Sequence, residues 1–295
     1  MKTKIENLVF KGGGVLGIAY TGAIEAFEEK KILTHVKRVA GTSAGAIVAT
    51  LLSLRYSAEE IKTLINQTDF KSFEDGAVVL DAIHVINKYG FYKGDVFLNV
   101  MKSQIEGKGL NANATFQDFE DKGCRDLHIF ASDLNIKGLK EFSVQKTPNV
   151  VVAEAVRASM SIPLFFRAWT FPNNNPDDHV YVDGGIIYNY PLTIFDVDGV
   201  QNPKTVGMFL ADLEQRTPPS KLEIGNFFKY ATSLVETILS AQAIDFEIDS
   251  TQKKRTIMID NLGISATDFK LTEAQKQALF ESGKKHAMEF LNGVG

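Results

Sequence analysis

Cysteine and histidine are scarce in this 295-residue sequence, and their scarcity limits the chemistry open to the protein. The single cysteine, Cys124, excludes an internal disulfide and any metal site built from cysteines alone, and it suits a reducing compartment such as the cytoplasm. The five histidines are scattered and lack the paired spacing of metal ligands. We therefore expect no metal site and no metal cofactor.

An excess of basic residues and long apolar runs are also missing. The 32 basic and 36 acidic residues leave a net charge of -4, which provides no basic field for a nucleic-acid partner. The apolar run Leu8–Phe10 is too short for a signal peptide, and no run reaches the roughly 18 apolar residues of a membrane span. We expect a cytoplasmic protein whose contact with membranes is peripheral.

The first apolar stretches break at glycines and then continue with helical spacing. Residues 5–10 predict a strand that breaks into a helix over 15–31, and residues 36–40 predict a second strand that breaks into a helix over 46–54. Two strand-turn-helix units in series indicate a parallel sheet with right-handed crossovers.

The rest of the chain continues this alternation, and we expect one α/β domain over residues 1–295, with a core at 6–212 and a helical portion at 213–295. Further strands are expected at 127–132, 141–145, 180–182, 204–210 and 255–259. Further helices are expected at 58–66, at 78–106 with breaks at Gly90 and Gly94, and at 150–159, 223–246 and 272–291. The helix at 223–246 has a broad apolar face, which either packs on the sheet or serves as a lid or an oligomer contact.

A serine lies in the second glycine turn. Gly41-Thr42-Ser43-Ala44-Gly45 fits the G-x-S-x-G pattern, in which small residues let a nucleophilic serine stand exposed on a sharp strand-to-helix turn. The alternative is a serine that only caps the helix. The position of the pentapeptide between a strand and an apolar helix favours the nucleophile.

The first glycine turn has two competing uses. Gly12-Gly13-Gly14-Val15-Leu16-Gly17 fits G-x-G-x-x-G, but a dinucleotide site needs an acid near the end of the next strand, and residues 39–42 contain none. The other use is an oxyanion hole made of glycine N–H groups at a helix start. Adjacent parallel strands would bring Gly13 and Gly14 beside Ser43.

The base for a serine nucleophile is better supplied by an aspartate than by a histidine. His286 lies in an amphipathic helix and His179 in a polar loop, where solvated side chains are expected. Asp183 follows an apolar strand and precedes two glycines, although an ordinary Asp-Gly turn is the alternative. A carboxylate could act as the base if apolar surroundings raised its pKa.

Together these motifs resemble the patatin-like phospholipase family. The resemblance extends over residues 6–212 and rests on Gly12–Gly17, Gly41–Gly45, Ala158–Pro163 and Asp183–Gly185 with Asn189, Pro191 and Leu192. At Leu16 the family often has a basic residue, and here Lys11 stands on the other side of the glycines.

The resemblance implies a three-layer α/β fold with a mainly parallel central sheet flanked by helices. It also implies a Ser-Asp hydrolase of lipid acyl esters, of the phospholipase A or lysophospholipase type, that needs no cofactor. Ser43 would be the nucleophile and Asp183 the base. Gly12, Gly13 and Gly14 would form the oxyanion hole, supported by Gly17, Gly41, Gly45, Gly184 and Gly185.

Substrate access and an alternative function complete the expectations. The aromatic stretch at 162–171 would pack mainly in the core, with one or two side chains lining the approach of a lipid at a membrane surface. The alternative is a regulatory protein that binds a nucleotide or phosphate in the glycine turn, or a hydrolase that a nucleotide activates. A homo-oligomer is a further expectation.

Overall fold

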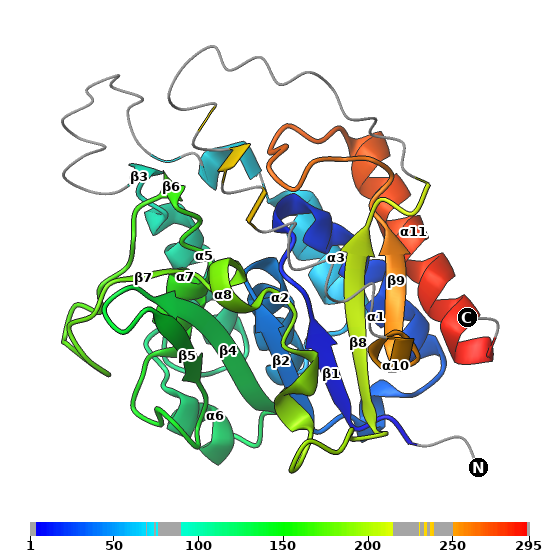
Figure 1. Cartoon of the computed structure of the whole chain (residues 1–295), viewed down its shortest axis with the longest axis horizontal. Helices are drawn as coiled ribbons and strands as arrows, with labels where there is room; N and C mark the ends of the chain where they lie inside the picture. The colour runs from blue at the N-terminus through cyan, green and yellow to red at the C-terminus, as the bar shows by residue number, and fades with distance from the viewer. Residues whose placement is uncertain are drawn as a thin grey trace.

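The computed structural model describes residues 4–68, 70–73, 75, 90–214 and 250–293, with isolated positions between 230 and 238. A central sheet is flanked by helices (Figure 1). Its strands are β1 (Asn7–Phe10), β2 (Arg38–Thr42), β4 (Asp126–Asp133), β5 (Gly138–Phe142), β7 (Tyr181–Asp183), β8 (Thr205–Ala211) and β9 (Thr256–Asp260).

The sheet has the order β5-β4-β2-β1-β8-β9, and β7 pairs with β4. The pairs β4–β2, β2–β1, β1–β8 and β8–β9 are parallel, whereas β5 and β7 run antiparallel to β4. The expected α/β fold with a mainly parallel sheet is therefore confirmed.

The helices are α1 (Ile18–Glu29), α2 (Ala44–Ser53), α3 (Ala58–Gln67), α5 (Asp95–Gly107), α6 (Phe116–Asp121), α7 (Val152–Ser159), α8 (Gly185–Tyr188), α10 (Ser250–Lys253) and α11 (Glu273–Asn292). In Figure 1, α1 lies behind β8 and β9 and α11 runs beside β9, and the two helices pack against each other. The predicted start of α3 is confirmed by a capping box between Ser57 and Glu60, and that of α11 by one between Thr272 and Gln275.

Alternation along the strands creates a core on each face of the sheet. Leu8 and Phe10 of β1 point to the larger core, under α1 and α2. Val9, between them, points to a smaller core with Ala40, Phe130, Phe209, Tyr190, Leu192 and Phe195, where the 3-10 helix η4 (Leu192–Phe195) covers the sheet. Both faces of the sheet are therefore buried, which explains the continuous apolar character of its strands.

Two expectations about local structure were wrong, and two short helices were not predicted. Residues 90–92, expected at a helix break, form the strand β3, which pairs in parallel with β6 (Leu164–Phe166) in a separate two-stranded sheet. The strand expected at 141–145 spans 138–142, because the preceding turn is tight and residues 143–147 close a turn of their own with Thr147 N donating to Ser143 O at 2.8 Å. The helices α6 and α8 were not predicted, since they are too short for a helical period to stand out.

The helix expected at 223–246 lies outside the described residues, apart from isolated positions. Within the described part of the chain, no helix combines the length and apolar character that crossing a membrane requires.

Candidate active site

The two glycine turns lie side by side, as their strand order predicted. β1 and β2 are parallel neighbours, with Phe10 opposite Gly41, so both chains leave the same edge of the sheet. The turns touch: a Cβ atom on Gly45 would lie 2.3 Å from Phe10 O, and one on Gly17 would lie 3.2 Å from Ala44 Cβ. Glycine at Gly45 therefore permits the close approach of the two turns.

Ser43 occupies a strained turn between β2 and α2. Its φ of 55° and ψ of -125° lie in a region that residues with a Cβ rarely adopt. A Cβ on Gly41 would lie 2.1 Å from Gly45 O, so the sharp turn requires glycine at Gly41. This geometry matches the strand-to-helix serine turn that the pentapeptide predicted.

Asp183 reaches Ser43 because β2 and β7 pair with successive parts of β4 and their ends meet. β2 pairs with β4 as far as Thr42 opposite Phe130, and β7 then pairs from the opposite direction, ending with Asp183 opposite Ala131. The last residue of β7 therefore lies at the end of β2. A Cβ on Gly184 would lie 2.3 Å from Phe130 O, so the glycine after Asp183 permits this junction.

The carboxyl group of Asp183 is poised to accept a proton. Burial raises its pKa from the ordinary value of 3.8 to about 6, against the opposing effects of the nearby Ser43 hydroxyl and of the hydrogen bond from the Gly185 N–H. Gly185 N donates to Oδ1 at 2.7 Å, while no described residue lies within hydrogen-bond distance of the buried Oδ2. Ser43 Oγ lies 3.6 Å from Met160 Sδ.

The end of α7 and the residues after it connect the serine turn to the strand that carries Asp183. Ser43 N donates to Ser159 Oγ at 2.8 Å, and Ser159 Oγ donates to Phe130 O at 2.6 Å. Asp183 N donates to Ser161 O at 2.9 Å. Sequence reasoning found this stretch only as a family motif and assigned no role to Ser159, because its partners are distant along the chain.

We expect the Ser159→Ala variant to react more slowly because it leaves the buried Ser43 N–H without an acceptor. The free energy of unfolding should fall by about 1–3 kcal/mol, and kcat by about 10- to 100-fold with little change in KM. Steady-state kinetics and urea unfolding measure both. The control is Ser282→Ala. Ser282 lies on α11, and its buried hydroxyl donates to Asp260 O at 2.7 Å. Equal loss of kcat in both variants would exclude a positioning role for Ser159.

The glycine turn presents free N–H groups at two of the three predicted positions. Gly12 N donates to Asn189 O at 3.0 Å, so the oxyanion role expected of Gly12 does not fit this structure. The N–H groups of Gly13 and Gly14 have no acceptor among the described residues. Gly14 has a φ of 54°, and a Cβ there would lie 2.0 Å from Ala266 O, so this position requires glycine.

Lys11 and the C-terminal portion complete the surroundings of the turn. The Lys11 ammonium lies 4.8 Å from the centre of the Phe209 ring, and burial lowers its pKa to about 8. It therefore packs toward β8. Val15 N donates to Ala266 O at 3.0 Å, so a residue beyond the motif-bearing core supports the turn.

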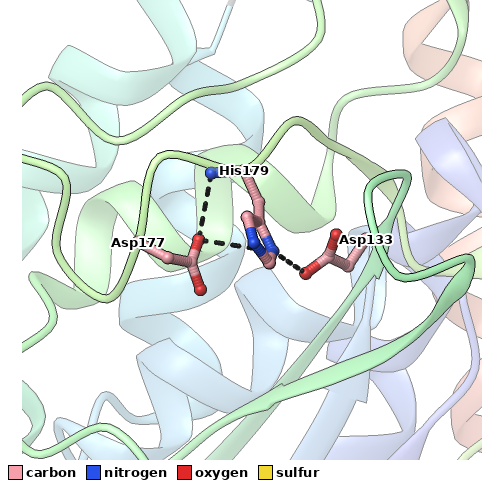
Figure 2. A group of neighbouring side chains, drawn as sticks. All are labelled: Asp133, Asp177 and His179. Carbon is pink, nitrogen blue, oxygen red and sulfur yellow. Dashed lines mark hydrogen bonds and ion pairs between the residues drawn. The ribbon is translucent and has the colours of Figure 1, made fainter.

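His179 has a structural setting rather than a catalytic one. Its Nδ1 lies 2.7 Å from Oδ2 of the buried Asp133 and 3.8 Å from Asp177 Oδ1 (Figure 2). The three side chains could in principle approach a metal ion, since their ligand atoms lie within 4.8 Å of one another. However, Asp177 already accepts from Lys140 Nζ at 3.0 Å and Tyr181 OH at 2.6 Å. The group is thus an internally paired network.

An apolar cavity opens beside the serine turn. The space between its lining residues, counted together with the solvent at its mouth, is about 600 Å³. Its lining comes from both turns and from α2, α3 and α5, and includes Gly14, Ala44, Val48, Leu64, Phe97 and Met101. The aromatic stretch at 162–171 does not line it. Phe165, Phe166 and Phe171 are buried in the core, which confirms the core role expected of most of that stretch, while the expected lining of a lipid approach by one or two of its side chains stays a prediction.

Comparison with known proteins identifies relatives of this chain. A model of the patatin-like phospholipase family matches residues 8–196. The uncharacterized protein YqhO of Bacillus subtilis is 34% identical over 96% of this chain and 97% of its own length. An uncharacterized protein of Acanthamoeba polyphaga mimivirus is 32% identical over 96% of this chain and 93% of its own length. A probable lipid hydrolase of Invertebrate iridescent virus 6 is 26% identical over 64% of this chain and 62% of its own length.

Solved structures share the fold. VipD from Legionella pneumophila aligns with a TM-score of 0.69 at 17% identity, covering 99% of this chain and 67% of VipD. ExoU in its complex with SpcU from Pseudomonas aeruginosa aligns with a TM-score of 0.58 at 19% identity, covering 99% of this chain and 52% of ExoU.

Proposed function

Because this chain belongs to the patatin-like phospholipase family, we propose that it hydrolyses fatty acyl esters of lipids, with Ser43 as the nucleophile and Asp183 as the base. The observation that carries the proposal is the pairing of a serine on a strained turn with a buried aspartate whose pKa is about 6. Relatives described as a probable lipid hydrolase and as a triacylglycerol lipase of Saccharomyces cerevisiae support lipid esters as the substrate class.

The reaction would proceed through an acyl-enzyme. As Ser43 Oγ attacks the acyl carbon, its proton passes to Asp183 Oδ2, and the carbonyl oxygen takes up the electron pair. The N–H groups of Gly13 and Gly14 would stabilise this oxyanion, helped by the start of the following helix. On collapse, Asp183 returns the proton to the leaving alcohol. Asp183 then takes a proton from a water molecule that attacks the acyl carbon, and it returns this proton to Ser43 Oγ as the bond to the acyl group breaks and the fatty acid leaves.

The apolar cavity supports a fatty acyl chain as the group held beside the serine. Its lining is almost wholly apolar, and Gly14 and Ala44 connect it to both turns. An acyl chain there would point its carbonyl carbon toward Ser43. We therefore favour a phospholipase A or lysophospholipase type of activity over a nucleotide-binding role.

Labelling with a fluorophosphonate probe tests this function. The probe phosphonylates an activated serine nucleophile, so we expect one modified peptide, containing Ser43. Peptide mapping by mass spectrometry identifies the site. Modification at another serine, or none in protein that hydrolyses esters, would contradict the assignment.

The Leu64→Trp variant tests the acyl cavity. Leu64 is half-buried on α3 and lines the cavity, so a larger side chain there should exclude long acyl chains while short ones still fit. We expect the ratio of kcat/KM for long-chain over short-chain esters to fall by about tenfold or more. Thr63→Trp is the control, because Thr63 is an exposed neighbour on the same helix and does not line the cavity. An unchanged ratio in Leu64→Trp would mean that the chain binds elsewhere.

A further inference from the structure

The hairpin that joins β4 to β5 exposes aliphatic side chains to solvent. Leu134 is 50% exposed, Ile136 59% and Leu139 36%. Single exposed aliphatic residues are ordinary on soluble proteins, whereas several in one turn mark an interaction surface. We refer to residues 134–139 as the apolar hairpin.

The apolar hairpin lies at the edge of the sheet that carries the candidate site. β4 runs parallel to β2 and extends beyond it, so its carboxyl end, like that of β2, faces this edge (Figure 1). Ser132, just before the hairpin, donates from Oγ to Asp183 O at 2.9 Å. On α8, which begins two residues after Asp183 and contacts β5, Ile187 is a further exposed aliphatic residue.

The buried carboxylate of Asp133 holds the turn of the hairpin in one conformation. Its Oδ1 accepts from Asn135 N at 2.9 Å and Ile136 N at 3.3 Å. Its Oδ2 lies 2.7 Å from His179 Nδ1, as Figure 2 shows. The carboxylate also keeps the pKa of His179 above its ordinary value, which favours the protonated, positively charged imidazole.

Backbone contacts add to this rigidity. Leu134 N donates to Val180 O at 3.0 Å, and Val180 N donates to Asn135 Oδ1 at 2.9 Å. The aliphatic side chains are thus displayed on an ordered support, and binding through them would cost little ordering entropy.

We propose that the apolar hairpin inserts into the lipid surface from which the candidate site takes its substrate. The choice of lipid as the partner rests on the proposed function. The choice of residues 134–139 as the docking surface rests on their exposure, their rigid turn and their position at the edge that carries the candidate site. Lys137, at the tip, is exposed and forms no ion pair with a described residue. Aliphatic residues beside a long basic side chain fit the boundary between acyl chains and anionic headgroups.

A second pair of exposed aliphatic residues supplies a matched control. Val197 is 66% exposed and Val200 69%. They lie in the turn that precedes the amino end of β8, at the opposite edge of the sheet, which is the lower edge in Figure 1. A protein that sits on a membrane through the apolar hairpin would hold this turn away from the lipid.

The test measures binding to vesicles apart from hydrolysis. Vesicles of ether-linked phosphatidylcholine with a minor fraction of ether-linked phosphatidylglycerol offer no acyl ester bonds to hydrolyse, so cosedimentation reports docking alone. We expect the triple variant Leu134→Ser, Ile136→Ser, Leu139→Ser to bind these vesicles about tenfold or more weaker than the wild type. The double variant Val197→Ser, Val200→Ser should bind like the wild type. Wild-type binding by the triple variant, or a loss confined to the double variant, would overturn the proposal.

Two further measurements distinguish a loss of vesicle binding from a failure of the proposed function and from misfolding of the variant. Hydrolysis of a monomeric short-chain ester should be unchanged in the triple variant; if the wild type also lacks this activity, the function fails while the vesicle result still decides the docking. In otherwise wild-type protein, Ile136→Trp should give a blue-shifted fluorescence contribution with vesicles, and Val200→Trp should not. No shift in Ile136→Trp would contradict insertion.

Discussion

The Ser43→Ala variant is expected to lose ester hydrolysis, with a fall in kcat of about 10⁴-fold or more. Alanine keeps the Cβ atom, so the strained backbone at φ 55° is as costly as before, and the backbone N–H can still donate to Ser159. The lost hydroxyl lies 3.6 Å from Met160 Sδ and beside the carboxyl group of Asp183, whose pKa it lowers. The variant should therefore unfold at nearly the wild-type temperature.

Activity and stability must be measured together to interpret this result. The assay is hydrolysis of a fatty acyl ester, alongside calorimetry and the fluorophosphonate reaction, which should label the wild type and leave the variant unlabelled. A folded Ser43→Ala protein that keeps more than about one hundredth of the activity would rule out Ser43 as the nucleophile.

The Asp183→Asn variant is expected to lose activity and gain stability above neutral pH. The amide cannot take the proton of Ser43, so kcat should fall by about 10³-fold or more. In the wild type, activity should rise with pH as Asp183 ionises near pH 6 and then level off, because only the ionised carboxylate is a base. A pH profile of kcat/KM measures this step.

The sign of the stability effect follows from the raised pKa. The folded protein holds the Asp183 proton more tightly than the unfolded chain, so the contribution is fully present below the unfolded pKa of 3.8 and is lost as pH rises through about 6. The shift corresponds to about 3 kcal/mol. The Asp183→Asn variant avoids this loss, so its melting temperature should exceed that of the wild type at pH 8 and match it near pH 3.5.

Asp196 provides the control for both measurements. Although its burial opposes ionisation, the ion pair with Arg255 lowers its pKa, with both oxygens 2.6 Å from the guanidinium. The Asp196→Asn variant should therefore be less stable than the wild type at pH 8 and keep the pH profile of activity. A melting temperature of Asp183→Asn below that of the wild type at pH 8 would show that the buried carboxylate stabilises the fold.

Much of the local structure near the candidate site was predictable from the sequence. The serine turn, the glycine turn and the starts of α3 and α11 depend on residues close together in the chain, such as Ser57 with Glu60. The pairing of β3 with β6 was not predictable in this way, because Gly90 and Leu164 are brought together by tertiary packing. The availability of each glycine N–H was also hidden, since Gly12 is occupied by the distant Asn189.

The sequence by itself determined which backbone conformations the two turns can adopt: small residues let Ser43 occupy a strained turn, and glycine lets position 14 adopt a positive φ at a helix start. These are local effects of missing Cβ atoms. Only the tertiary structure decided that Asp183 meets Ser43, because β7 pairs with β4 where β2 ends. Burial at that junction also raises the pKa of Asp183. A carboxylate at the end of a strand becomes a candidate base only where distant strands bury it beside the serine.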